Sequence, residues 1–134
     1  MYAIHLIEYA RNLRQDASAL LRSNHGGDTV ELPFTYVLLR GEGHVALIDV
    51  GDNQLDPETR AIHAQDGVAF WQPPEVLLPL LGVRPEDIDT VLLTHAHFDH
   101  MDNLPAFPNA TFIIQRREIE ETLVFEGLHI SRIR

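Results

Sequence analysis

The chain has 134 residues, of which 45% are hydrophobic, and its ten basic and twenty acidic residues give a net charge of −10. This length predicts a single domain over residues 1–134, and the apolar fraction is sufficient for a packed core. The acidic excess argues against a nucleic-acid backbone as partner, and the lack of an apolar run of about 18 residues argues against a membrane span.

The start of the chain, Met1–His5, lacks the basic segment followed by an apolar stretch that marks a signal peptide. The chain contains no cysteine, which leaves the compartment undecided, so the cytoplasm is the default expectation. Residues 2–9 alternate loosely between apolar and polar and predict a strand. Residues 10–30 predict a partly helical excursion or a loop, either as a surface connection or as a flap over a site.

Two strong strand patterns follow at residues 34–39 and 45–48, and a glycine-containing turn separates them. Asp49 ends the second strand, and two roles for it remain open. It is either a turn residue that caps nearby backbone donors or a supporting residue that orients a ligand histidine.

Two short helices are predicted next. Residues 58–65 form the first, and an Asp-Gly pair ends it. His63 lies in this helix without a metal-ligating neighbour in the sequence, so we expect it to be solvated. Residues 75–81 form the second helix, which two prolines open and Gly82 closes, although Pro79 makes its boundary weak.

A dense set of metal-type side chains follows the next strand. Residues 85–89 predict a turn, and residues 91–93 form a short apolar run typical of a buried strand. Three imidazoles and one carboxylate come directly afterwards, in Thr94-His95-Ala96-His97-Phe98-Asp99-His100. Neutral imidazole and carboxylate are the ligands that zinc and similar divalent metals prefer where no thiolate is available.

The spacing of these side chains suits two neighbouring metal ions. His95 and His97 are two residues apart and point the same way in an extended segment, and Asp99 continues this alternation. His100 turns to the other side if the chain bends there. The sequence therefore predicts a metal site at His95, His97, Asp99 and His100, on a loop at the carboxyl end of a strand.

After the motif, residues 101–104 predict the start of a helix, with Asp102 as its amino-terminal acid. Residues 111–115 predict a strand, and residues 116–125 predict a charged helix that ends at Gly127.

The pattern H-x-H-x-D-H after a short apolar strand resembles that of the metallo-β-lactamase superfamily of metal-dependent hydrolases. The sequence of residues 94–115, THAHFDHMDNLPAFPNATFIIQ, is most similar to that of the N-acyl homoserine lactonase branch. The predicted hairpin of residues 34–49 and the Asp-x-Gly of residues 49–51 also resemble that family. The resemblance covers most of residues 30–115.

The resemblance implies an α/β fold, namely the amino-terminal half of an αββα sandwich with a mixed sheet and flanking helices. The family takes a further histidine, a bridging aspartate and a last histidine from its second half. None of these appears here in matching context, so residues 1–134 are expected to form a domain that is incomplete at its carboxyl end. A complementary carboxyl-terminal segment or self-association is the expected partner. Asp102 departs from the family branch, which often has glycine there.

The activity implied by the resemblance is hydrolysis of an ester or lactone in a small-molecule substrate by a metal-activated water. His95 and His97 would hold the first of two zinc ions, and Asp99 and His100 would serve the second. Asp99 would also act as the catalytic residue that transfers a proton. Two alternatives remain open: a thioesterase or glyoxalase II-like hydrolase of the same superfamily, and a metal-binding module without turnover.

Overall fold

The computed structural model describes residues 1–21 and 26–120 of the chain. It contains the following strands, helices and 3-10 turns in chain order: β1 (Ala3–Asp16), a turn (Ala17–Ala19), β2 (Thr29–Gly41), β3 (His44–Ile48), α1 (Pro57–Asp66), β4 (Val68–Ala69), α2 (Pro74–Leu80), a turn (Pro85–Asp87), β5 (Thr90–Leu92), α3 (Phe98–Met101), a turn (Leu104–Ala106) and β6 (Thr111–Ile113). Within this part of the chain, no helix is both long and apolar enough to cross a bilayer.

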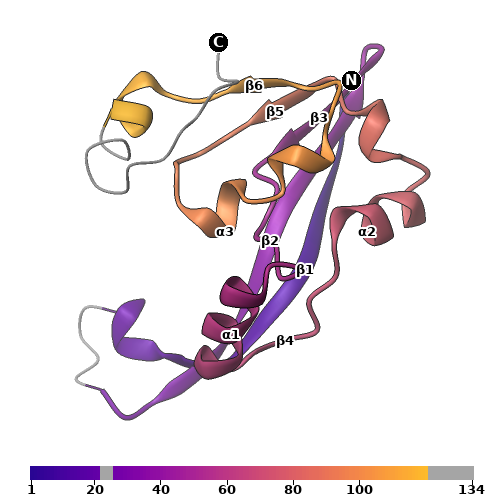
Figure 1. Cartoon of the computed structure of the whole chain (residues 1–134). Helices are drawn as coiled ribbons and strands as arrows, with labels where there is room; N and C mark the ends of the chain where they lie inside the picture. The colour runs from indigo at the N-terminus through magenta and orange to yellow at the C-terminus, as the bar shows by residue number, and fades with distance from the viewer. Residues whose placement is uncertain (22–25, 121–134) are drawn as a thin grey trace.

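The strands form one mixed sheet in the order β4-β1-β2-β3-β5-β6. The hairpin of β2 and β3 is antiparallel, as are the pairs of β1 with β2 and β4, whereas β3–β5 and β5–β6 are parallel. Figure 1 shows the long β1–β2 hairpin crossing the molecule, with β3, β5 and β6 beside one end and α1 and β4 beside the other. The predicted α/β fold with a mixed sheet and flanking helices is confirmed.

The first strand is much longer than the sequence predicts. β1 continues to Asp16, and Arg11 and Gln15 pair with Pro33 and Val30 of β2, where a partly helical excursion or loop was expected. That prediction was wrong because the register shifts twice along this pair, which interrupts the strict alternation that identifies a strand. The continued pairing with β2 satisfies the backbone groups of this stretch.

The helices agree better with their sequence signals. Asp56 caps α1 by accepting a hydrogen bond from the Thr59 backbone N–H at 2.8 Å, and Gly67 ends the helix with φ of 80°. The second helix, α2, ends one residue earlier than predicted. Residues 116–120 are helical, and the rest of that predicted helix, including Gly127, lies outside the described residues.

The hydrophobic core lies between one face of the sheet and the helices. Leu38, Leu47 and Val91, on β2, β3 and β5, are completely buried on this face. Leu78 of α2, Ile88 and Phe107 belong to the same buried cluster. Burial of these side chains supplies most of the stability of such a layer.

The opposite face of the sheet carries an apolar row that crosses five strands. Its members are aligned by the strand register: Leu6, Val37, Ile48, Leu92 and Ile113. Leu6 at one end is 71% exposed and Ile113 at the other is 48% exposed. The described residues therefore leave an apolar face uncovered, which is the arrangement expected of one half of a sandwich.

Candidate metal centre and adjoining cavity

The metal motif starts where β5 ends, beside the end of β3. Because β3 and β5 are parallel, Asp49 after β3 and Thr94 after β5 meet at the same edge of the sheet. The chain stays extended up to His97, which has φ of −78° and ψ of 149°, and then enters α3. Asp99 and His100 thus lie on a helical turn, so the predicted alternation ends at His97. Asp102, predicted at the start of a helix, follows the end of α3 instead.

The turn nevertheless brings the four predicted side chains together. The ring of His95 lies 4.6 Å from that of His97 and 4.0 Å from that of His100, measured between centroids. His95 Nε2 is 3.1 Å from His97 Nδ1, and His100 Nε2 is 3.5 Å from Asp99 Oδ2. Ring nitrogens and carboxylate oxygens therefore face one another within one small volume.

Asp49 fixes the orientation of His100. Its Oδ1 accepts a hydrogen bond from the Thr94 backbone N–H, and its Oδ2 accepts one from the Thr94 hydroxyl and contacts His100 Nδ1, all at 2.8 Å. When Nδ1 donates its proton to this carboxylate, Nε2 of His100 is left unprotonated, with its lone pair free to bind a metal near Asp99. Of the two roles that the sequence left open for Asp49, both are present: it binds backbone and it orients a histidine.

The electrostatics of the site favour the neutral form of His95 and the protonated form of His100. Burial, together with the charges of His100 and His97, lowers the pKa of His95 below its ordinary value. The hydrogen bond to Asp49 raises the pKa of His100. Burial opposes the ionisation of Asp49, but its hydrogen bonds with His100 and Thr94 together lower its pKa. Neutral imidazole is the form that binds metal.

The donor set fits a divalent metal by its chemistry, but it does not form a finished coordination site. Among the described residues, no group of three histidine, aspartate or glutamate side chains is arranged, as it stands, to hold an ion. The rings of His95, His97 and His100 contact one another instead. Four donors shared between two ions would also leave each ion short of protein ligands.

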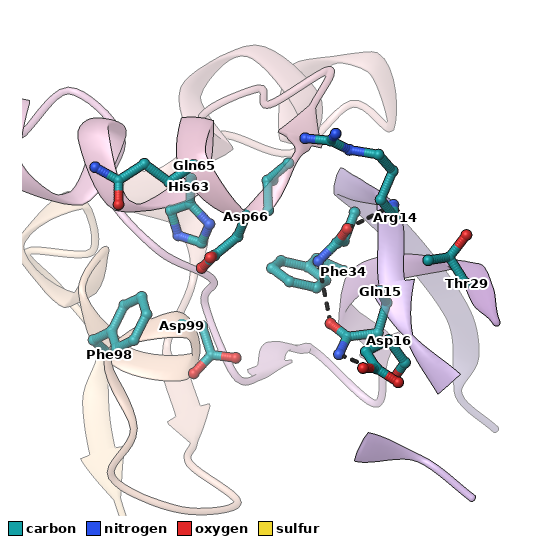
Figure 2. Close-up of a pocket in the computed structure, with 12 residues that line it drawn as sticks. Arg14, Gln15, Asp16, Thr29, Phe34, His63, Gln65, Asp66, Phe98 and Asp99 are labelled. Carbon is teal, nitrogen blue, oxygen red and sulfur yellow. Dashed lines mark hydrogen bonds between the residues drawn. The ribbon is translucent and has the colours of Figure 1, made fainter. Parts of the chain in front are cut away.

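A cavity of about 730 Å³ adjoins the motif at Asp99. Figure 2 shows Asp99 and Phe98 on one side of it, with the far ends of β1 and β2 on the other. Aromatic rings of Phe34, Phe98 and His63 form part of its wall, and polar side chains form much of the rest: Asn12, Arg14, Gln15, Asp16, Thr29, Gln65 and Asp66. This size is within the range of small-molecule sites.

His63 was expected to be solvated, and this expectation was wrong. Its ring is 4% exposed, lines the cavity and makes an ion-pair contact through Nε2 with Oδ2 of the completely buried Asp52. Hydrophobic spacing gives no signal for this, because the adjacent apolar residue Ile62 is 46% exposed. The helix presents its histidine rather than its isoleucine to the interior.

Tyr9 is a further supporting residue that sequence patterns did not identify. Its hydroxyl donates a hydrogen bond to the Asp99 backbone carbonyl at 2.9 Å, and its ring stacks on Tyr36. Burial, reinforced by the carboxylates of Asp52 and Asp99, raises the pKa of Tyr9 far above its ordinary value. The phenol therefore keeps its proton and remains a donor to the motif.

Comparisons with known proteins agree with the resemblance seen in the motif. Residues 30–133 match the family model of the Metallo-beta-lactamase superfamily. The N-acyl homoserine lactonase AttM of Azorhizobium caulinodans is 33% identical over 110 residues, which cover 75% of this chain and 41% of that protein. The chain thus spans about two fifths of the length of this curated relative.

Solved structures share the fold. A probable metal-dependent hydrolase from Staphylococcus aureus matches with a TM-score of 0.72 at 23% identity, over 94% of this chain and 51% of that one. AidC, a dizinc quorum-quenching lactonase bound to its product, matches with a TM-score of 0.63 at 18% identity, over 92% of this chain and 45% of that one. The predicted similarity to the lactonase branch is confirmed by the sequence identity to AttM proteins.

Proposed function

Because the chain belongs to the metallo-β-lactamase superfamily, we propose that it supplies the metal-binding half of a hydrolase that opens a lactone or a similar acyl ester. The observation that carries this proposal is the convergence of His95, His97, Asp99 and His100, with Asp49 directing His100 Nε2 into the group. The lactonase activity of relatives such as AttM supports the substrate class.

In this proposal His95 and His97 hold the first metal, and Asp99 and His100 serve the second. Two zinc ions are the proposed cofactor, in keeping with the dizinc lactonase that shares the fold. Divalent metals of this kind polarise a carbonyl group and lower the pKa of a water molecule. The remaining ligands would come from a complementary carboxyl-terminal segment or from a second copy of the chain.

The residues of the chain would position the substrate and transfer the proton of the attacking water. The acyl part of a small-molecule substrate would occupy the cavity, with its reacting carbonyl beside Asp99. The carboxylate of Asp99 would accept the proton that the attacking water loses and pass it to the leaving oxygen as the ring opens. The walls formed by Phe34 and Phe98 would exclude water from one side of the reacting group. A cytoplasmic location stays a prediction from the sequence.

The test is a substrate panel on the full-length protein. We expect the zinc-loaded protein to hydrolyse N-acyl homoserine lactones faster than acyl thioesters, and a preference for thioesters would favour the glyoxalase II-like alternative. Zinc bound without turnover of either class would favour a metal-binding module.

Zinc content provides the test of the ligands. A His95→Ala/His97→Ala variant should lose most of its zinc by elemental analysis, because both proposed ligands of the first metal are gone. A His5→Ala variant removes a histidine of β1 outside the motif and should keep its zinc. Equal zinc in the wild type and the double variant would refute the assignment.

A further inference from the structure

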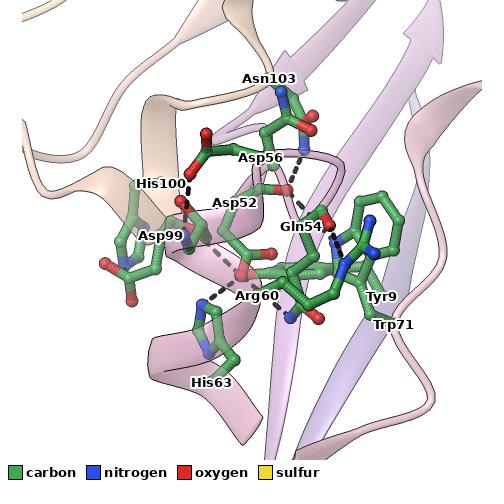
Figure 3. A network of polar contacts seen from close by, with 12 residues as sticks. Tyr9, Asp52, Gln54, Asp56, Arg60, His63, Trp71, Asp99, His100 and Asn103 are labelled. Carbon is green, nitrogen blue, oxygen red and sulfur yellow. Dashed lines mark hydrogen bonds and ion pairs between the residues drawn. The ribbon is translucent and has the colours of Figure 1, made fainter.

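We propose that the buried Asp52–His63 pair is a positioning element that holds the turn carrying Asp99 and His100. The inference deepens the proposed function and rests on it for the role of that turn. Figure 3 shows Asp52 within a network that includes His63 and Asn103, with Asp99 and His100 of the motif close by. Neither member of the pair belongs to the motif, and His63 lies on α1, more than thirty residues earlier in the sequence.

The burial of the pair requires its members to stay together. Asp52 is completely buried and His63 is 4% exposed. A carboxylate in such a place is costly unless a charged or hydrogen-bonding partner compensates it. His63 Nε2 contacts Asp52 Oδ2, and the Gln54 side-chain amide donates to the same oxygen at 3.1 Å. Asp52 thus lies against the Nε2 side of the His63 ring.

The ring of His63 transmits this constraint to the motif. It packs against the ring of Phe98, with centroids 5.8 Å apart, and against that of Phe34 at 6.0 Å. Phe98 is the residue between His97 and Asp99, and it is the first residue of α3. A change in the position of its side chain therefore acts directly on the backbone that carries two proposed metal ligands.

Asp52 also reaches the other end of the same segment. Its backbone carbonyl accepts a hydrogen bond from the side-chain amide of Asn103, which follows α3, and another from Trp71 Nε1 at 3.3 Å. Asn103 also donates to the Val50 carbonyl at 3.1 Å. Asp52 thus supports residues 98–103 at both ends, through its side chain and His63 at one end and through its backbone at the other.

Other contacts hold the middle of the segment by its backbone. The Tyr9 hydroxyl binds the Asp99 carbonyl, and the Val50 N–H binds the His100 carbonyl at 3.0 Å. These bonds fix the path of the chain, whereas His63 acts on the side chain of Phe98. Since His63, Phe98 and Asp99 line one cavity, the pair also sets the shape of the wall next to the proposed reaction site.

The test uses two variants of the full-length protein that separate the two properties of His63. His63→Gln keeps a hydrogen-bond donor for Asp52 but loses the ring that packs on Phe98. His63→Phe keeps a ring but leaves Asp52 without the imidazole nitrogen that contacts it. Leu78→Ala is the matched control, because it opens the buried core at α2, an element that packs on β1 and the turn Pro85–Asp87.

The first readout is the set of imidazole ring resonances of the motif in the metal-free protein, measured by nuclear magnetic resonance. We expect both His63 variants to shift the resonances of His97 and His100, and the cobalt-loaded proteins to show changed visible absorption bands. Leu78→Ala should lower the melting temperature without either change. With a lactone substrate, His63→Gln should lower kcat about tenfold or more, with KM within about threefold of wild type.

The inference would be overturned if both His63 variants kept wild-type ring resonances and cobalt bands while melting at a lower temperature, as Leu78→Ala does. In that case the pair would only stabilise the fold. The ring resonances need neither metal nor turnover. If the wild-type protein hydrolysed no acyl substrate, the proposed function would therefore fail while the resonances still decided whether the pair positions the turn.

Discussion

Replacement of Asp49 by asparagine tests whether this carboxylate prepares His100 for metal binding. Asp49 serves three donors, two from Thr94 and one from His100 Nδ1, each at 2.8 Å. An amide has one oxygen, so if that oxygen stays with the Thr94 N–H, its NH2 group faces His100. His100 must then accept through Nδ1 and carry its proton on Nε2, which blocks the nitrogen that faces Asp99.

The expected losses in zinc affinity and in stability follow from the hydrogen bonds that the asparagine amide cannot make. Removal of a residue that orients a metal ligand lowers metal affinity by about 10–100-fold, which corresponds to about 1.4–2.8 kcal/mol. The metal-free protein should also lose about 1–3 kcal/mol of unfolding free energy with one or two charge-assisted hydrogen bonds. We expect the lower part of this range, because the His100 side chain is 27% exposed and water replaces part of the interaction.

Zinc competition against a chromophoric chelator measures the affinity, and urea unfolding of the metal-free protein measures the stability. Asp56→Asn is the matched control, because Asp56 caps α1 through Thr59 and asparagine caps a helix about as well. The reasoning is refuted if Asp49→Asn binds zinc as tightly as the wild type while Asp56→Asn is also unchanged.

Four further predictions concern catalysis, backbone strain, ionisation and assembly. Asp99→Asn should lower kcat far more than it raises KM, because proton transfer is lost while binding remains, and an unchanged kcat would remove Asp99 from the mechanism. Gly51→Ala should lower the unfolding free energy, measured by urea titration, by about 1–3 kcal/mol. Gly51 has φ of 75°, and a Cβ atom there would lie 3.0 Å from the Tyr9 ring. A variant as stable as the wild type would contradict this prediction. The carboxyl of Asp87 should titrate by nuclear magnetic resonance with a pKa of about 2, because hydrogen bonds from Arg84 lower it. Its contribution to the stability of the fold is present above the unfolded pKa of 3.8 and is lost as the pH falls through about 2. Arg84→Gln should raise the titration midpoint of Asp87. Size-exclusion chromatography with light scattering should find the chain bound to a complementary segment or self-associated, because one face of the sheet is apolar and exposed. A stable 15.2 kDa monomer that hydrolyses lactones at ordinary rates would exclude such an assembly.

Local patterns were sufficient to predict the parts of the fold that local chemistry determines. The hairpin of β2 and β3, the helix after Asp56 and the strand before the motif all follow from spacing, caps and turn residues. The four motif residues stand out in the sequence in the same way, because their density in a short stretch does not depend on the rest of the chain, and their role as metal ligands stays a prediction. Their geometry was predicted less well, since α3 begins inside the motif.

Contacts between distant segments account for what the sequence did not predict. The second half of β1 is a strand because β2 pairs with it across two register shifts, and no local pattern encodes these shifts. His63 is buried because Asp52, from another loop, offers it a partner. Tyr9 reaches Asp99 from ninety residues away. Such supports are chosen by tertiary packing, which outweighs local propensity.

The parallel pairing of β3 with β5 makes the metal site a late product of folding. Asp49 and Thr94 are 45 residues apart, and their contact needs the whole crossover between them, including α1 and α2, to close first. In the proposed function, metal binding would thereby be coupled to completion of the sheet, and we expect an isolated peptide of residues 90–103 to bind zinc more weakly than the folded chain.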